Sequence, residues 1–182
     1  MDPGGIKPEP VKLGLIVGEV TLRAFHPLPD DNPCYALIGL VAAEQARIEH
    51  MLDVTIWELG EIDPAVGACI TGQMMGMYGR YFAMLQLASY RAVPAAMIKE
   101  ITQLQNKSGS LADLRNRIIH DPWLEDTSTG GSYQFKSKAK RDTRYGPEPV
   151  TEADLKSTLA SFRSHYGRVL KLRSDVWALM RA

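Results

Sequence analysis

The chain has 182 residues, of which 45% are hydrophobic and 23% are charged. This composition is that of an average globular protein, and it excludes a disordered, collagen-like or coiled-coil chain as a whole. The length favours one domain, and it is enough to bury a core without disulfides or a structural metal. The 21 basic and 21 acidic residues balance, so no global field draws the protein to nucleic acid or acidic lipid.

The charge is nevertheless unevenly distributed along the chain. Residues 1–90 carry 5 Lys and Arg against 11 Asp and Glu, whereas residues 91–182 carry 16 against 10. Any anion-binding surface is therefore expected in the second half. Cys34 and Cys69 stand far apart with no Cys or His at ligand spacing, so we expect neither a metal site nor another cofactor. No signal-peptide pattern and no apolar run of about 18 residues is present, which predicts a cytoplasmic protein without a membrane span.

The first elements follow a segment rich in Pro and Gly. We interpret residues 1–32 as an N-terminal extension, with a short hairpin within Lys12–Phe25 as the only regular structure. A helix is predicted over residues 33–60, because Asn32 can cap it and Pro33 suits its first position. A second helix, apolar on most sides, is predicted over 64–91, which is typical of a core or an interface.

Two shorter helices are predicted next, over residues 94–106 and 111–120, separated by a polar break. Residues 123–146 are expected to form a hairpin inserted before the last helix, which spans 151–181. The sequence therefore predicts an all-α bundle of four to five helices over 33–182, with a short β-hairpin insertion and an irregular N-terminal segment.

The most informative stretch combines Arg115, Asn116 and His120, an R-x4-H pattern near the end of the predicted fourth helix. In a helical chain this pattern resembles the HEPN superfamily, whose members are small helical bundles. The resemblance implies a metal-independent endoribonuclease of a toxin–antitoxin or antiviral defence system. It also implies a homodimer that brings two motifs together, and an antitoxin or other defence-system partner protein. Some members are inactive, so the alternative is a non-catalytic module that binds a protein or nucleotide.

The three side chains suit RNA cleavage by attack of the 2′-OH on the adjacent phosphate. His120 can move protons near neutral pH, and a helix C-terminus favours its protonated form. Arg115 offers a permanently charged fork for the phosphorane, while Asn116 lies four residues before His120 on the same helix face. The structural alternative is that Arg115 pairs with an acid of the first helix and that His120 caps its own helix.

Glu44 lies in the middle of the apolar stripe of the first helix, where an unpaired carboxylate is costly. We expect it to pair with Arg115 or with Arg173, which interrupts the apolar stripe of the last helix in the same way. Glu44 is then either a structural ion-pair partner or an acid that orients Arg115 or His120. His165 has no comparable setting in the sequence.

A basic run follows the motif and is interleaved with aromatic residues, an arrangement that suits contact with an RNA backbone. The alternative is a solvated hairpin whose lysines protect an edge strand. Trp123, just before this run, is either a platform for a base or an anchor for the insertion. The basic residues are Lys136, Lys138, Lys140, Arg141 and Arg144.

Overall fold

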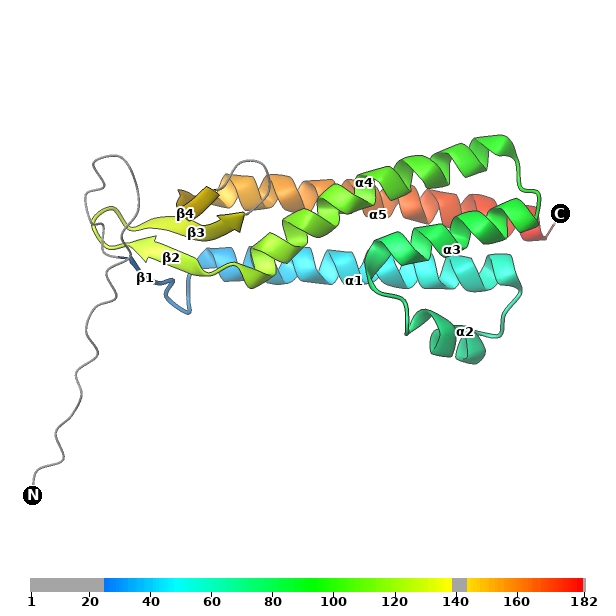
Figure 1. The fold of residues 1–182 in the computed structure, drawn as a ribbon, viewed down its shortest axis with the longest axis horizontal. Coiled ribbons are helices and arrows are strands. Elements are labelled where there is room, and N and C mark those ends of the chain that lie inside the picture. Colours follow the sequence, from blue (N-terminus) through cyan, green and yellow to red (C-terminus); the bar gives the residue numbers. More distant parts are fainter. Residues whose placement is uncertain (1–24, 139–143, 182) are drawn as a thin grey trace, which may run out of the picture.

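The computed structural model describes residues 25–138 and 144–181. Within these ranges, five helices form a mostly helical bundle with a four-stranded antiparallel sheet at one end (Figure 1). Helices α1 and α5 begin at the sheet and α4 ends there. The helices are α1 (Pro33–Gly60), α2 (Pro64–Thr71), α3 (Gly76–Tyr90), α4 (Ala95–His120) and α5 (Glu152–Met180). The strands are β1 (Phe25–Pro27), β2 (Trp123–Asp126), β3 (Gly131–Lys138) and β4 (Arg144–Pro149).

The two longest helices begin as their sequences predict. The Asn32 side chain accepts a hydrogen bond from the backbone N–H of Cys34 at 3.0 Å, and Pro33 occupies the first turn of α1. At α5, the Thr151 hydroxyl accepts from the Asp154 N–H while the Asp154 carboxylate accepts from the Thr151 N–H, a reciprocal capping box. The predictions of helices over 33–60 and 151–181 are therefore confirmed.

The predicted helix over 64–91 is wrong, because the chain turns between α2 and α3. Buried Arg80 stabilises this turn by donating to the carbonyls of Met74 and Gly76 at 2.9 and 3.0 Å. Its Nε also donates to Asp53 of α1 at 2.8 Å. One guanidinium thus satisfies carbonyls that the broken helix leaves free and ties the turn to α1.

The predicted break between 94–106 and 111–120 is also wrong, since α4 runs through it without interruption. The hydroxyls of Ser108 and Ser110 donate to the carbonyls of Gln105 and Lys107 inside the helix. Ser108 is only 1% exposed, so its packing in the core keeps this stretch helical although its residues locally favour a turn.

The sheet is larger than the predicted hairpin. Strands β2 and β3 do pair across a turn that contains Gly130 with φ 67°, as expected for 123–146. However, β1 pairs with β2 and β4 pairs with β3, so the sheet order is β1-β2-β3-β4. Phe25–Pro27 of the expected extension therefore belongs to the sheet, while the rest of the predicted hairpin within Lys12–Phe25 lies outside the described residues.

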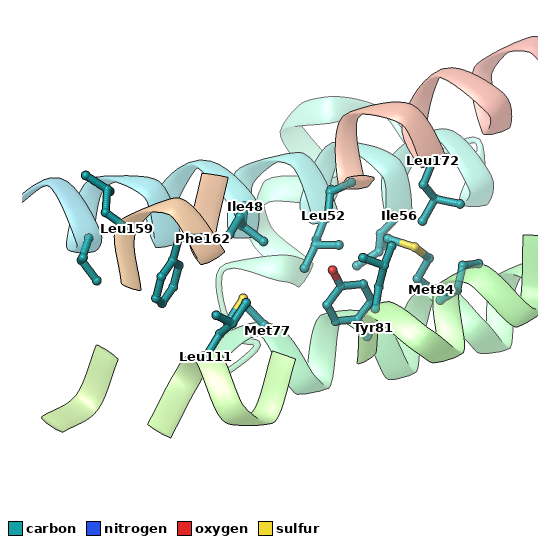
Figure 2. Packing of buried hydrophobic residues seen from close by; sticks show 14 of the residues in the cluster. Ile48, Leu52, Ile56, Met77, Tyr81, Met84, Leu111, Leu159, Phe162 and Leu172 are labelled. Carbon is teal, nitrogen blue, oxygen red and sulfur yellow. The ribbon is translucent and has the colours of Figure 1, made fainter. Parts of the chain in front are cut away.

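The core lies between α1, α3, α4 and α5, where apolar side chains interdigitate along the bundle axis (Figure 2). It contains one polar pair, in which the Tyr81 hydroxyl lies 2.7 Å from His165 Nε2. Burial lowers the pKa of His165 to about 4, assisted by the charges of Arg168 and Lys107. Burial also raises the pKa of Tyr81, so near neutral pH Tyr81 keeps its proton and donates it to a neutral imidazole. Fully buried side chains of the core include Ile48, Leu52, Ile56, Met77, Met84, Leu111 and Phe162.

Replacement of Gly67 by Ala tests how α2 is attached to α1. A Cβ at Gly67 would lie 2.5 Å from Cδ1 of Trp57, whose indole also donates to Thr71. We expect Gly67→Ala to lower the free energy of unfolding by about 1–3 kcal/mol through overpacking. Gly79→Ala is the matched control, because a Cβ there meets nothing within 4 Å. The control should be neutral or stabilising in urea denaturation, and equal losses in both variants would contradict this packing.

The Tyr81–His165 pair predicts a pH dependence of stability. The unfolded chain binds a proton at His165 near pH 6.5, whereas the folded protein binds it only near pH 4. Stability is therefore fully present above pH 6.5 and falls as the pH drops toward 4, by an upper bound of about 3 kcal/mol. Urea denaturation at pH 7 and pH 5 should show a smaller loss in His165→Gln than in the original chain. The same loss in both proteins would refute this assignment.

Candidate functional site

The structure brings Arg115, Asn116 and His120 together on the last turns of α4. Arg115 Nη1 lies 3.2 Å from Asn116 Oδ1 and 3.4 Å from His120 Nε2. Asn116 and His120 are exposed, whereas Arg115 is half-buried. One guanidinium nitrogen of Arg115 therefore contacts both Asn116 and His120, and these two side chains face solvent, where a substrate could reach them.

The contact with Arg115 defines which ring nitrogen of His120 carries the proton in this structure. A guanidinium only donates hydrogen bonds, so His120 Nε2 accepts and the neutral ring carries its proton on Nδ1. His120 is the last residue of α4, and Asp121 follows it directly. Burial raises the pKa of the Asp121 carboxyl, and the charges of Arg117 and Lys136, with that of His120 when its ring is protonated, oppose that rise. Cations therefore lie around the Asp121 carboxylate at the end of α4.

Arg115 has no acidic partner among the described residues, contrary to the structural alternative of an ion pair with α1. Its Nε is buried and has no hydrogen-bond partner in the described part of the chain. The charge of Arg115 is thus held in place by Asn116 and His120 without being neutralised by a carboxylate. A guanidinium in this state attracts an anionic ligand.

Glu44 is buried and paired with arginine as predicted, but its partners differ from those expected. Its Oε1 lies 3.1 Å from Arg47 Nη1 and 3.3 Å from Arg163 Nε of α5. Arg173 instead pairs with Glu58 at 2.8 Å. Because α5 packs along the whole of α1, the arginines opposite these two acids come from α5 and not from the end of α4. Glu44 makes no hydrogen bond to Arg115 or His120, so the predicted orienting role has no contact to support it.

The basic run is only partly within the described residues. The Lys136 ammonium pairs with the Glu148 carboxylate across β3 and β4, which offsets its charge. Lys138 and Arg144 face each other in register at the ends of these strands. Lys140 and Arg141 lie outside the described residues. Of the five cations, Lys136 therefore acts as a cross-strand partner within the sheet.

Trp123 anchors the sheet to α4. Its indole is buried, and Nε1 donates to the carbonyl of Ile118 at 2.8 Å. The Gln134 side-chain amide of β3 donates to the carbonyl of Arg117 at 2.7 Å. The carbonyls of Arg117 and Ile118 thus accept hydrogen bonds from the sheet, which supports the helix end that carries His120. Of the two alternatives for Trp123, the contacts support the anchor for the insertion, since the ring is buried.

Comparison of the chain with known protein families, with curated proteins and with solved structures gives no match. Among the described residues, no helix is long and apolar enough to span a lipid bilayer.

The anchoring role of Trp123 can be tested by replacing it with Phe. The ring remains, but the Ile118 carbonyl loses its donor, which should cost about 1–2 kcal/mol of unfolding free energy. Amide hydrogen exchange should become faster at residues 115–121, next to the released carbonyl. Trp177→Phe is the control, because that indole is 42% exposed on α5. Unchanged exchange at 115–121 in Trp123→Phe would show that this bond does not fix the helix end.

Proposed function

We propose that the protein is a metal-independent endoribonuclease of the HEPN type, acting in a toxin or antiviral defence system. The single observation that carries the proposal is the 3.4 Å contact between Arg115 Nη1 and His120 Nε2 at an exposed helix end. The fold supports it, because a helical bundle presents the motif on the last turn of a long helix. The exposure of His120 also favours catalysis over a purely structural role, since a catalytic imidazole must reach its substrate.

The proposed reaction uses the 2′-OH of the substrate as its nucleophile. Arg115 moves from His120 Nε2 to the substrate phosphate, and the freed lone pair of Nε2 takes the 2′-OH proton as that oxygen attacks the adjacent phosphorus. The dipole at the end of α4 stabilises the resulting imidazolium. Arg115 then stabilises the pentacoordinate dianion, with Asn116 keeping the guanidinium in place. The bond to the 5′-oxygen breaks, that oxygen takes a proton, and the products are a 2′,3′-cyclic phosphate and a 5′-OH.

A homodimer suits this chemistry, because one imidazole takes a proton while a second copy of His120 supplies the proton for the leaving oxygen.

An exposed apolar surface on α2 and α3 supports contact between copies. Met75, Tyr78 and Phe82 follow one face of α3, with exposures of 92%, 66% and 55%. Large exposed apolar side chains gathered in this way are typical of an interface. Val66 and Ile70 of α2 extend the surface.

Replacement of His120 by Ala should reduce RNA cleavage by roughly 10²–10⁴-fold, because the proton carrier is lost while an exposed side chain leaves no cavity. Arg115→Lys should also reduce cleavage, since an ammonium keeps the charge but not the planar fork. The assay uses purified protein, a mixed RNA pool and end-group analysis of the products. We expect 2′,3′-cyclic phosphate ends and unchanged rates in EDTA.

His50→Ala is the matched control, because His50 is also exposed but lies on α1, away from the motif. This variant should cleave at the original rate. Circular dichroism establishes that each variant is folded before its rate is compared. Full cleavage by folded His120→Ala, or products without cyclic phosphate, would contradict the proposed mechanism.

A further inference from the structure

Three hollows, of about 320, 450 and 570 Å³, lie along the seam between α4 and α5, and together they are called the crevice. The first lies beside the sheet and is lined by Arg117 and Thr158 among others. Arg168 lines both the second and the third hollow, which are therefore neighbours, whereas the first shares no lining residue with them. Each is large enough for a unit of nucleotide size.

The middle hollow carries positive charge without a compensating acid in its lining. Lys107 comes from α4 and Arg168 from α5. The hydroxyls of Ser157 and Ser164 lie on one face of α5 and add donors beside these cations, while the Ser161 hydroxyl donates to the carbonyl of Ser157. Each of the other two hollows has acids in its lining, Asp154 in the first and Glu100 with Asp175 in the third. The middle of the crevice is therefore its most favourable place for an anion.

A histidine adds a further donor to the middle hollow. His165 lines this hollow although the residue is only 3% exposed. Its Nε2 accepts a hydrogen bond from the Tyr81 hydroxyl, so Nδ1 carries the proton of the neutral ring. That Nδ1–H has no hydrogen-bond partner among the described residues and is not one of their buried unpartnered atoms, so it is open to the hollow, where it can donate to an anion.

The two cations are available to a ligand. Lys107 has no ion-pair partner among the residues that the structure describes. Arg168 contacts Glu100 at 2.9 Å and Gln103 at 3.3 Å, but both side chains of its ion pair are about 40% exposed. Such surface pairs are worth little, so a phosphate can replace or share the carboxylate.

We propose that the crevice between α4 and α5 binds the phosphodiester backbone of single-stranded RNA, with Lys107, Arg168 and His165 Nδ1–H around one phosphate. This inference rests on the proposed function, because it supplies the path by which substrate reaches His120. Arg117 at the end of the crevice and His120 are three residues apart on α4, which places them about 60° apart around the helix. A strand that extends from the middle hollow past Arg117 reaches the turn of α4 that carries His120.

Fluorescence anisotropy with a labelled 2′-O-methyl RNA oligonucleotide tests the proposal. This probe lacks the attacking hydroxyl and cannot be cleaved by 2′-OH attack, so binding is measured separately from catalysis. Lys107→Gln/Arg168→Gln should weaken binding at least tenfold. It should also reduce the slope of log Kd against log salt by about 0.7, because both cations contact the same phosphate and each phosphate contact on a single strand contributes about 0.7. Both side chains are exposed, so folding should be retained.

The matched control is Lys99→Gln/Arg181→Gln, which removes the same charge at exposed positions outside the crevice lining. It should bind nearly as tightly as the original chain. Equal weakening in both double variants would overturn the proposal. The proposal would also be overturned if the slope of log Kd against log salt fell only in the triple variant Lys138→Gln/Lys140→Gln/Arg141→Gln. Failure of the original chain to bind RNA, with binding of an acidic peptide instead, would also overturn it. His120→Ala should bind the probe normally, so tight binding without any cleavage of natural RNA would refute the proposed catalysis alone.

Discussion

The end of α4 is the constraint on which the candidate site depends. A helix leaves its last four carbonyls without internal partners, and an unsupported end frays. Here Trp123 donates to the carbonyl of Ile118, and Gln134 adds a second bond to the carbonyl of Arg117, which also accepts from the Asp121 N–H, so the sheet supports the helix end. The backbone N–H of Phe135 also donates to Pro122 at 2.8 Å, which fixes the first residues after the helix. Since Arg115 and His120 lie within this supported turn, the small sheet serves to position the motif.

Those parts of the fold that depend on neighbouring residues could be predicted from the sequence. The caps of α1 and α5 each use a side chain and a backbone group within three residues, so Asn32 and Thr151 identify them directly. The turn at Gly130 is equally local. The spacing of four residues between Asn116 and His120 is likewise local and places both on one helix face. The Arg115–His120 contact was not predicted, because residues five apart lie about 140° from each other around a helix.

The parts that failed depend on contacts between distant residues. The turn before α3 is stabilised by Arg80 reaching Asp53, and no local signal indicates that this arginine is buried. The Ser108–Ser110 stretch has the composition of a break, yet the core retains it in α4. His165 was not singled out, because its partner Tyr81 lies 84 residues away. Glu44 shows the intermediate case: burial predicted an arginine partner, but only the packing of α5 on α1 selects Arg163.

The opposite charges of the two halves of the chain are explained by this packing. Helix α1 supplies Glu44 and Glu58, and the facing arginines of α5 pair with them. Its remaining described acids, Glu49 and Asp53, surround Arg80 of α3. The acids of α1 are therefore paired with arginines, either of the first half of the chain or of α5. Some cations of the second half pair with acids of their own half, as Arg168 does with Glu100, whereas Lys107 and Arg115 have no acidic partner among the described residues. A chain without net charge can in this way present a positive surface from the α4–α5 crevice to the end of α4, where the motif lies.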